Sequence, residues 1–134
     1  LNIQRGREHG LARYNATRIA LGFAPKATFA DVTSDVVLQA NLASVYASPN
    51  DIDLWVGGLA EDHVPGALVG ETFFTIIADQ FRRARDGDRF WYQYYLPEPF
   101  LSLVSATRLS DIVRRNTGIG AEISNDMFHV PTAP

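Results

Sequence analysis

The first ten residues hold the densest group of side chains that could do chemistry. In order they are Leu1-Asn2-Ile3-Gln4-Arg5-Gly6-Arg7-Glu8-His9-Gly10. Guanidinium and amide donors set this close together suit the recognition of an anion, because arginine presents a rigid fork of N–H groups to a carboxylate or phosphate. A stretch this polar is more often simply a solvated loop. Composition alone leaves both interpretations open.

A second group of polar side chains lies at residues 50–61, where Asp51 and Asp53 alternate with apolar residues. Paired aspartates can bind a metal ion or perform acid–base chemistry, but a calcium loop needs more oxygen ligands in a tight run. Gly57-Gly58 lacks the lysine and serine of a phosphate-binding loop. We therefore predict a compact turn in which the aspartates cap backbone N–H groups and the glycines permit close packing.

The remaining titratable residues form no recognisable catalytic set. The three histidines, His9, His63 and His129, are far apart and none has the spacing of a metal-binding motif. We expect His63 at the surface and His129 in the tail. No serine lies in a nucleophile-elbow sequence. We assign no metal ligand within these residues.

Length and composition indicate one folded unit spanning residues 1–134. Hydrophobic residues make up 46% of the chain and charged residues 20%, which disfavours disorder. The net charge of −3 gives no electrostatic reason to expect a nucleic-acid partner. No apolar run approaches the roughly 20 residues of a membrane span. With no cysteine, these residues contain neither a disulfide nor a thiolate metal site.

Apolar periodicity predicts a mainly α fold, with helices over residues 11–21, 35–46, 69–85 and 105–115. In the third of these, an apolar stripe is predicted to face the core: Val69, Phe73, Ile76, Ile77 and Phe81. Residues 85–95 combine a charged turn with an aromatic run. Arginines beside aromatics can stack on single-stranded nucleic acid, but two aspartates neutralise this patch, so we predict a salt-bridged turn beside an aromatic core.

Five blocks of the sequence together resemble the animal-type haem peroxidases, the peroxidase–cyclooxygenase superfamily. The first is LNIQRGREHGLARYN at residues 1–15, and the others are NDIDLWVGGLAE at 50–61, IIADQFRR at 76–83, RDGDRFWY at 85–92 and NTGI at 116–119. The blocks match only the C-terminal part of the catalytic domain. The resemblance therefore implies the C-terminal helical portion of an animal haem peroxidase-like domain.

The resemblance also implies roles for three residues of the opening segment. Asn2 takes the place of the asparagine that accepts the Nδ1 proton of the proximal haem histidine, an interaction that orients the imidazole and tunes its donation to iron. Arg5 takes the place of an arginine that pairs with a haem propionate. Leu1 is expected to contact the haem edge. Arg7, Glu8 and His9 are expected to form a hydrogen-bonded scaffold, with His9 not an axial ligand.

The rest of the haem site is expected upstream of residue 1. In the family, the proximal histidine, the distal histidine and arginine, and the calcium loop all lie there, so any calcium would be bound outside this chain. We expect the segment alone neither to hold haem tightly nor to turn over peroxide. Its implied partners are haem, hydrogen peroxide, a small reducing substrate and the remainder of the domain.

The implied activity of the parent protein is reduction of hydrogen peroxide coupled to oxidation of a halide or small organic donor. Two alternatives stay open: a fatty-acid dioxygenase or cyclooxygenase-like enzyme on the same fold, and a haem-less binding or adhesion module derived from a peroxidase. The family also implies a secreted or extracytoplasmic location.

Overall fold

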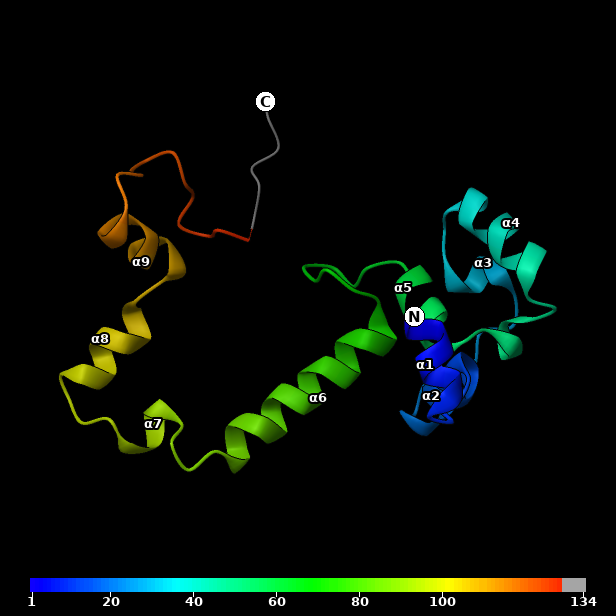
Figure 1. Ribbon diagram of the computed structural model, residues 1–134, viewed down its shortest axis with the longest axis horizontal. Helices are drawn as coiled ribbons and strands as arrows, with labels where there is room; N and C mark the ends of the chain where they lie inside the picture. Colours follow the sequence, from blue (N-terminus) through cyan, green and yellow to red (C-terminus); the bar gives the residue numbers. More distant parts are fainter. Residues whose placement is uncertain (129–134) are drawn as a thin grey trace. The chain divides into compact units, whose positions relative to one another are not determined.

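The computed structural model describes residues 1–128, and the regular elements within that range are all helical (Figure 1). This confirms the predicted mainly α class. The helices are α1 (Asn2–Glu8), α2 (Tyr14–Ala20), α3 (Phe29–Val32), α4 (Val36–Val45), the 3-10 turn η1 (Pro49–Asp51), α5 (Leu54–Ala60), α6 (Glu71–Gly87), α7 (Tyr92–Tyr95), α8 (Phe100–Ala106) and α9 (Leu109–Asn116).

The helices divide into two compact units, Leu1–Arg85 and Asp86–Pro134. In the N-terminal unit, α2 packs against α5 and η1, α3 packs against α4, and α1 contacts α5. Five buried apolar side chains form its core, with half-buried neighbours packed around them: Tyr14, Val32, Leu42, Ile52 and Ala60. The core thus lies under α2, α4 and α5, while α1 is at its edge.

The opening segment is a helix, so the interpretation as a loop was wrong. Helix α1 ends in a paired C-terminal motif: the N–H of Gly10 bonds to the carbonyl of Arg7 at 3.1 Å, and that of Leu11 to the carbonyl of Gly6 at 2.9 Å. Gly10 has a φ of +66°, a left-handed conformation that glycine adopts without steric cost. This stop signal after several good helix formers is the sequence feature that could have indicated the helix.

Residues 54–60 are also helical, contrary to the predicted turn. Neither glycine of Gly57-Gly58 marks a chain reversal, since both lie inside α5. A Cβ on Gly57 would overlap the ring of Tyr14, and one on Gly58 would overlap the ring of Phe73. Close packing by the glycines is therefore confirmed. The helix tolerates their unfavourable propensity because α2 and α6 approach it at these two positions.

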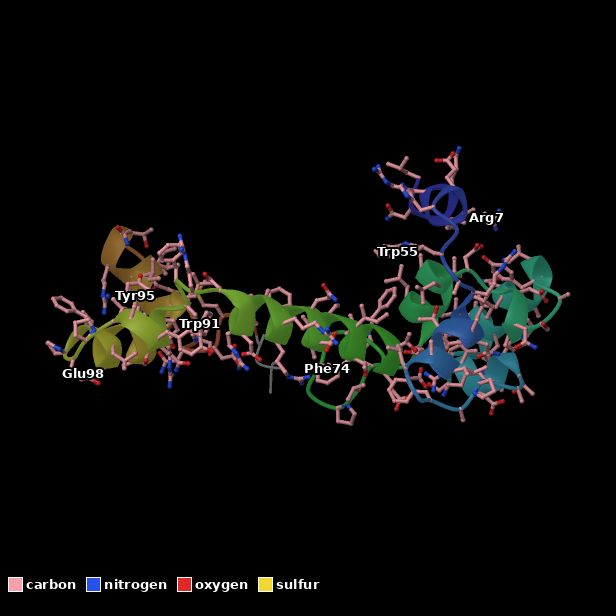
Figure 2. All side chains as sticks on the ribbon, turned by 90° about the horizontal axis from the view of Figure 1, so that it is seen from below. Arg7, Trp55, Phe74, Trp91, Tyr95 and Glu98 are labelled. Atoms are coloured by element: carbon pink, nitrogen blue, oxygen red, sulfur yellow. The ribbon has the colours of Figure 1, made fainter. Side chains whose placement is uncertain are left out.

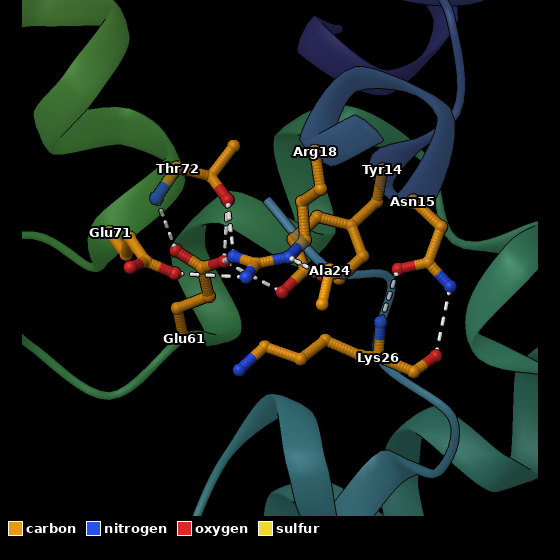
Figure 3. Close-up of polar contacts among 8 residues, drawn as sticks. All are labelled: Tyr14, Asn15, Arg18, Ala24, Lys26, Glu61, Glu71 and Thr72. Carbon is orange, nitrogen blue, oxygen red and sulfur yellow. Dashed lines mark hydrogen bonds and ion pairs between the residues drawn. The ribbon is translucent and has the colours of Figure 1, made fainter. Parts of the chain in front are cut away.

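A buried ion pair joins α2 to the end of α5 and the start of α6 (Figure 3). The Arg18 Nη1 atom lies 2.7 Å from Glu61 Oε1, and both side chains are only 4% exposed. Arg18 also donates to the carbonyl of Ala24 at 3.0 Å and to Glu71 Oε2 at 2.9 Å. The desolvation of these charges is offset because each is paired and hydrogen-bonded.

Three neutral donors complete the coordination of Glu61. The hydroxyls of Tyr14 and Thr72 donate to Glu61 Oε1 at 2.7 Å and 2.5 Å, and the backbone N–H of Thr72 donates to Oε2 at 2.7 Å. Burial, reinforced by the bond to Glu61, raises the pKa of Tyr14 and keeps its hydroxyl protonated. Because Thr72 lies in the first turn of α6, the carboxylate also satisfies a free N–H group at that helix end.

The predicted helix at 69–85 is confirmed as α6, but its stripe is only partly buried within this chain. Phe73 and Ile76 are half-buried, whereas Ile77 is 45% and Phe81 75% exposed. The predicted core role is therefore wrong, within this chain, for Ile77 and Phe81. The aromatic run 90–95 differs in the same way, because Phe90, Tyr94 and Tyr95 are all exposed.

In the C-terminal unit, residues 105–115 form two helices, where one was predicted. Helix α8 ends at Ala106, and α9 begins at Leu109. The carboxylate of Asp111 accepts the backbone N–H of Arg108 at 2.9 Å and so fixes the new helix start. The predicted Gly118 stop lies just beyond the end of α9 at Asn116.

Candidate functional site

Helix α1 brings Asn2 and Arg5 to one pocket of the N-terminal unit. The two side chains lie three positions apart and therefore share a face of the helix. The pocket has a volume of about 580 Å³ and lies between α1, the start of α5 and α6. Figure 2 labels Arg7 on α1 and Trp55 on α5, the two helices on either side of it. Its lining is Asn2, Ile3, Arg5, Gly6, His9, Leu11, Ala12, Arg13, Asp53, Leu54, Trp55 and Phe73.

Most of the pocket wall is apolar, with the polar groups contributed largely by α1. Trp55 packs against Phe73 with ring centroids 5.6 Å apart, and Trp55 is 44% exposed. Asn2, Arg5 and His9 add an amide, a guanidinium and an imidazole. A pocket of this kind suits a largely apolar group that carries an anionic edge.

Three arginines lie near the pocket, and they differ in what they pair with. Arg7 donates to Asp53 through Nε at 2.9 Å and Nη2 at 2.6 Å. Arg13 donates to the carbonyl of Asp51 and lies 3.6 Å from Asp53 Oδ1. Arg5 makes no ion pair with any other residue of the described range 1–128. Its guanidinium is therefore the one of these three that retains its full capacity for an anion.

Asp53 interacts with several side chains at this edge of the N-terminal unit. The Arg7 hydrogen bond lowers the pKa of Asp53, although burial opposes the shift, and Tyr46 lowers it further by donating at 2.9 Å. Because the folded-state pKa lies below the unfolded value, Asp53 stabilises the fold above that unfolded value. The contribution is lost as the pH falls through the lowered folded pKa.

Asp53 does not play the capping role predicted for it. It occupies the N-cap position of α5, yet its side chain accepts no bond from that helix. Asp51 instead accepts the hydroxyl of Ser48 at 2.7 Å. The tertiary partner Arg7 lies 46 positions away in the sequence, so local capping rules could not find this pair.

The other residues of the opening segment lie in different surroundings. Leu1 is 93% exposed and is absent from the pocket lining, whereas Ile3 lies in it. Arg7 fulfils the predicted scaffold role through Asp53, and Glu8 accepts from Gln4 at 2.9 Å within α1. His9 lines the pocket. His63 is exposed as predicted, and His129 lies outside the described residues.

Three further observations concern metal binding, membrane spanning and glycosylation within residues 1–128. Across residues 1–128, no three histidine, aspartate or glutamate side chains gather as a metal site. In the same range, no helix has the length and apolar character needed to cross a bilayer. Asn15 of the sequon Asn15-Ala16-Thr17 is 2% exposed and donates to Lys26 and Asn50, so it presents no acceptor for glycosylation.

Comparisons with known proteins agree on one family. The family model described as animal haem peroxidase matches residues 1–128. The chain is 45% identical to peroxinectin A of Dictyostelium discoideum over 95% of its own length and 24% of that protein. It is 40% identical to human eosinophil peroxidase, covering all of this chain and 19% of that protein.

A solved structure supports the same assignment. Peroxidase A of Dictyostelium discoideum superposes on 92% of this chain with a TM-score of 0.74 and 44% sequence identity. The match covers 23% of that structure's chain, so this chain spans about a quarter or less of the relatives it matches. A helical fold, the five sequence blocks and the family match over residues 1–128 together show that the chain belongs to the animal haem peroxidase family.

Proposed function

We propose that this chain is the C-terminal part of the catalytic domain of a haem peroxidase. The parent protein would reduce hydrogen peroxide and oxidise a halide or small organic donor. Asn2 would accept the Nδ1 proton of a proximal histidine supplied by the remainder of the domain, Arg5 would pair with a haem propionate, and Leu1 would contact the haem edge. The relatives named as peroxidases support the activity.

Our proposal for the site depends above all on Arg5. Arg5 lines a largely apolar pocket, shares a helix face with Asn2 and pairs with no anion among residues 1–128. Haem matches such a pocket, because it has a flat apolar body with carboxylates at one edge. A two-point hydrogen bond from Arg5 to a propionate would fix the edge of the group as well as neutralise it.

Asn2 would act on the chemistry indirectly. Haem, when bound, would supply the iron redox chemistry for peroxide reduction and donor oxidation. The amide oxygen of Asn2 holds the ring N–H of an imidazole and fixes its orientation. Because an amide carries no net charge, it gives the imidazole less anionic character than a carboxylate would, which keeps the iron easier to reduce.

Substitutions in the full-length protein test both roles. Asn2→Ala should lower the peroxidase rate about 10- to 100-fold, the range found when a partner of a metal ligand is removed. Asn2→Asp should lower the haem reduction potential, and Arg5→Ala should lower haem retention. The measurements are the Soret spectrum, the potential and peroxide-dependent donor oxidation.

Matched controls separate these roles from general damage. Gln4→Ala removes an exposed amide from the same helix, and Arg83→Ala removes a cation whose ion pair with Asp79 is exposed. Both should leave the spectrum and rate at native values. A parent with no Soret band would favour the haem-less module, and fatty-acid oxygenation would favour the dioxygenase. Unchanged spectra in Asn2→Ala would refute the role of Asn2.

The expected location also follows only from the family. We propose secretion or an extracytoplasmic site for the parent protein. Cell fractionation of a tagged full-length protein tests this, with recovery in the cytosol as the contrary result.

A further inference from the structure

Asp53 makes an unusual use of its position at the start of α5. An aspartate at a helix N-cap ordinarily accepts the free N–H groups of the first turn. Here the carboxylate accepts two bonds from Arg7 and one from Tyr46, and none from its own helix. Its side chain is only 10% exposed, so its acceptor capacity is committed to contacts between elements.

Helix α1 depends on such a contact for its placement. Apart from half-buried Gly6, every residue of the seven-residue helix is exposed. A helix this short has little stability of its own and takes its place from tertiary contacts. The Arg7–Asp53 pair supplies one at the point where α1 meets α5.

The geometry of the pair fixes more than one degree of freedom. Nε and Nη2 of Arg7 donate to different oxygens of Asp53, so the two planar groups are aligned along an edge. Such an arrangement restrains both the rotation of α1 about its axis and its sliding along α5. Asn2 and Arg5 lie on the same short helix, so both restraints apply to them as well.

We propose that Asp53 is a positioning residue for the haem side of the pocket. Through Arg7 it holds α1 in the register that presents Asn2 and Arg5, and Tyr46 steadies the carboxylate from α4's C-terminal end. This inference rests on the proposed function, since it assumes that Asn2 faces a proximal histidine.

The test uses the full-length protein with Asp53→Asn and Arg7→Lys. Asparagine keeps the shape of Asp53 but loses its charge, while lysine keeps the charge of Arg7 but loses the fork. Arg7 is largely exposed, so Arg7→Lys provides a variant that should fold even if Asp53→Asn does not. Two quantities are measured: hydrogen exchange of the α1 amides in haem-free protein, and the Fe(III)/Fe(II) potential of the holoprotein.

Both variants should speed exchange in α1, and both should shift the potential in the same sense as Asn2→Ala. In the double variant Asp53→Asn with Asn2→Ala, the potential should equal that of Asn2→Ala alone, because Asp53 acts through Asn2. Asp62→Asn provides the control, since Asp62 accepts from Ser34 away from α1. That variant should leave both quantities at native values.

Other outcomes overturn the inference in distinguishable ways. Native exchange in α1 in both variants would show that the pair does not hold the helix, whatever the haem chemistry. A second contrary result is faster α1 exchange in Asp53→Asn and Arg7→Lys with a native potential, while Asn2→Ala does shift the potential. Asp53 would then have a structural role only. A native potential in Asn2→Ala itself would instead refute the proposed function and, with it, the role assigned to Asp53.

Discussion

At the residue scale, the chain contains two acidic side chains that play different parts. Glu61 is buried with Arg18 and joins three helices, whereas Asp53 lies at the rim of the pocket and joins α1 to α5. The first stabilises the unit as a whole. The second binds Arg7 on α1, the helix that also carries Asn2 and Arg5.

Removing the carboxylate of Glu61 should unfold the N-terminal unit readily. In Glu61→Ala, Arg18 remains buried without its closest counter-charge, and Tyr14 and Thr72 lose their acceptor. Breaking one side of a buried pair costs about 3–5 kcal/mol in the free energy of unfolding. Chemical denaturation of the full-length protein measures this loss.

Asp79→Ala is the matched control for that prediction. Asp79 pairs with Arg83 four positions along α6, and both side chains are substantially exposed. Such a pair contributes about 0.3–0.5 kcal/mol, because water screens it. A loss in Glu61→Ala no greater than in Asp79→Ala would contradict the structural role of the buried pair.

At the element scale, α5 is notable for carrying two glycines where close packing needs them. Gly57→Ala should destabilise the fold, because the added Cβ meets the Tyr14 side chain, including its Cβ, which cannot move without shifting α2. Overpacking of this kind costs about 1–3 kcal/mol. Thermal unfolding of the full-length variant tests the expected decrease in melting temperature.

Gly87→Ala separates this packing effect from glycine's helix propensity. Gly87 is the last residue of α6, and a Cβ there would meet no atom within 4 Å. The substitution should leave the melting temperature unchanged or raise it slightly. If both variants behaved alike, the close approach of Tyr14 to α5 would not be what requires Gly57.

The elements also show which parts of the structure the sequence could predict. Helices α2, α4 and α6 were predictable because their apolar spacing and end signals agree, as at Gly22, whose φ is +87° after α2. Helices α1 and α5 were missed, because polar residues and glycines obscure the helical period. Their stability comes from tertiary contacts with Asp53, Tyr14 and Phe73, which sequence spacing does not reveal.

The candidate site divides in the same way. The resemblance supplied Asn2 and Arg5, and the structure places both at one pocket. The Arg7–Asp53 pair and the place of Trp55 in the pocket wall depend on the contact between α1 and α5, which the sequence does not show. Residues close in sequence were therefore accessible to prediction, whereas partners brought together by the fold were not.

At the scale of the whole molecule, the exposed apolar side chains point to a larger structure around this chain. Phe74, Ile77 and Phe81 on α6 are 46%, 45% and 75% exposed, and Figure 2 shows Phe74 projecting from that helix. Contiguous apolar surface of this kind ordinarily marks an interface. The chain spans only 23% of the solved peroxidase that it matches, so the remainder of such a domain is the covering surface that we propose.

Phe81→Ala in the full-length protein tests this covering. If the ring is buried against the remainder of the domain, the substitution should cost about 3–5 kcal/mol, whereas an exposed ring would cost no more than about 0.5 kcal/mol. Gln80→Ala is the control, because Gln80 is exposed on the same helix and directed about 100° away from Phe81. Denaturant unfolding measures both. Equal, small losses would mean that α6 keeps this face in water in the intact protein, and the proposed covering would be refuted.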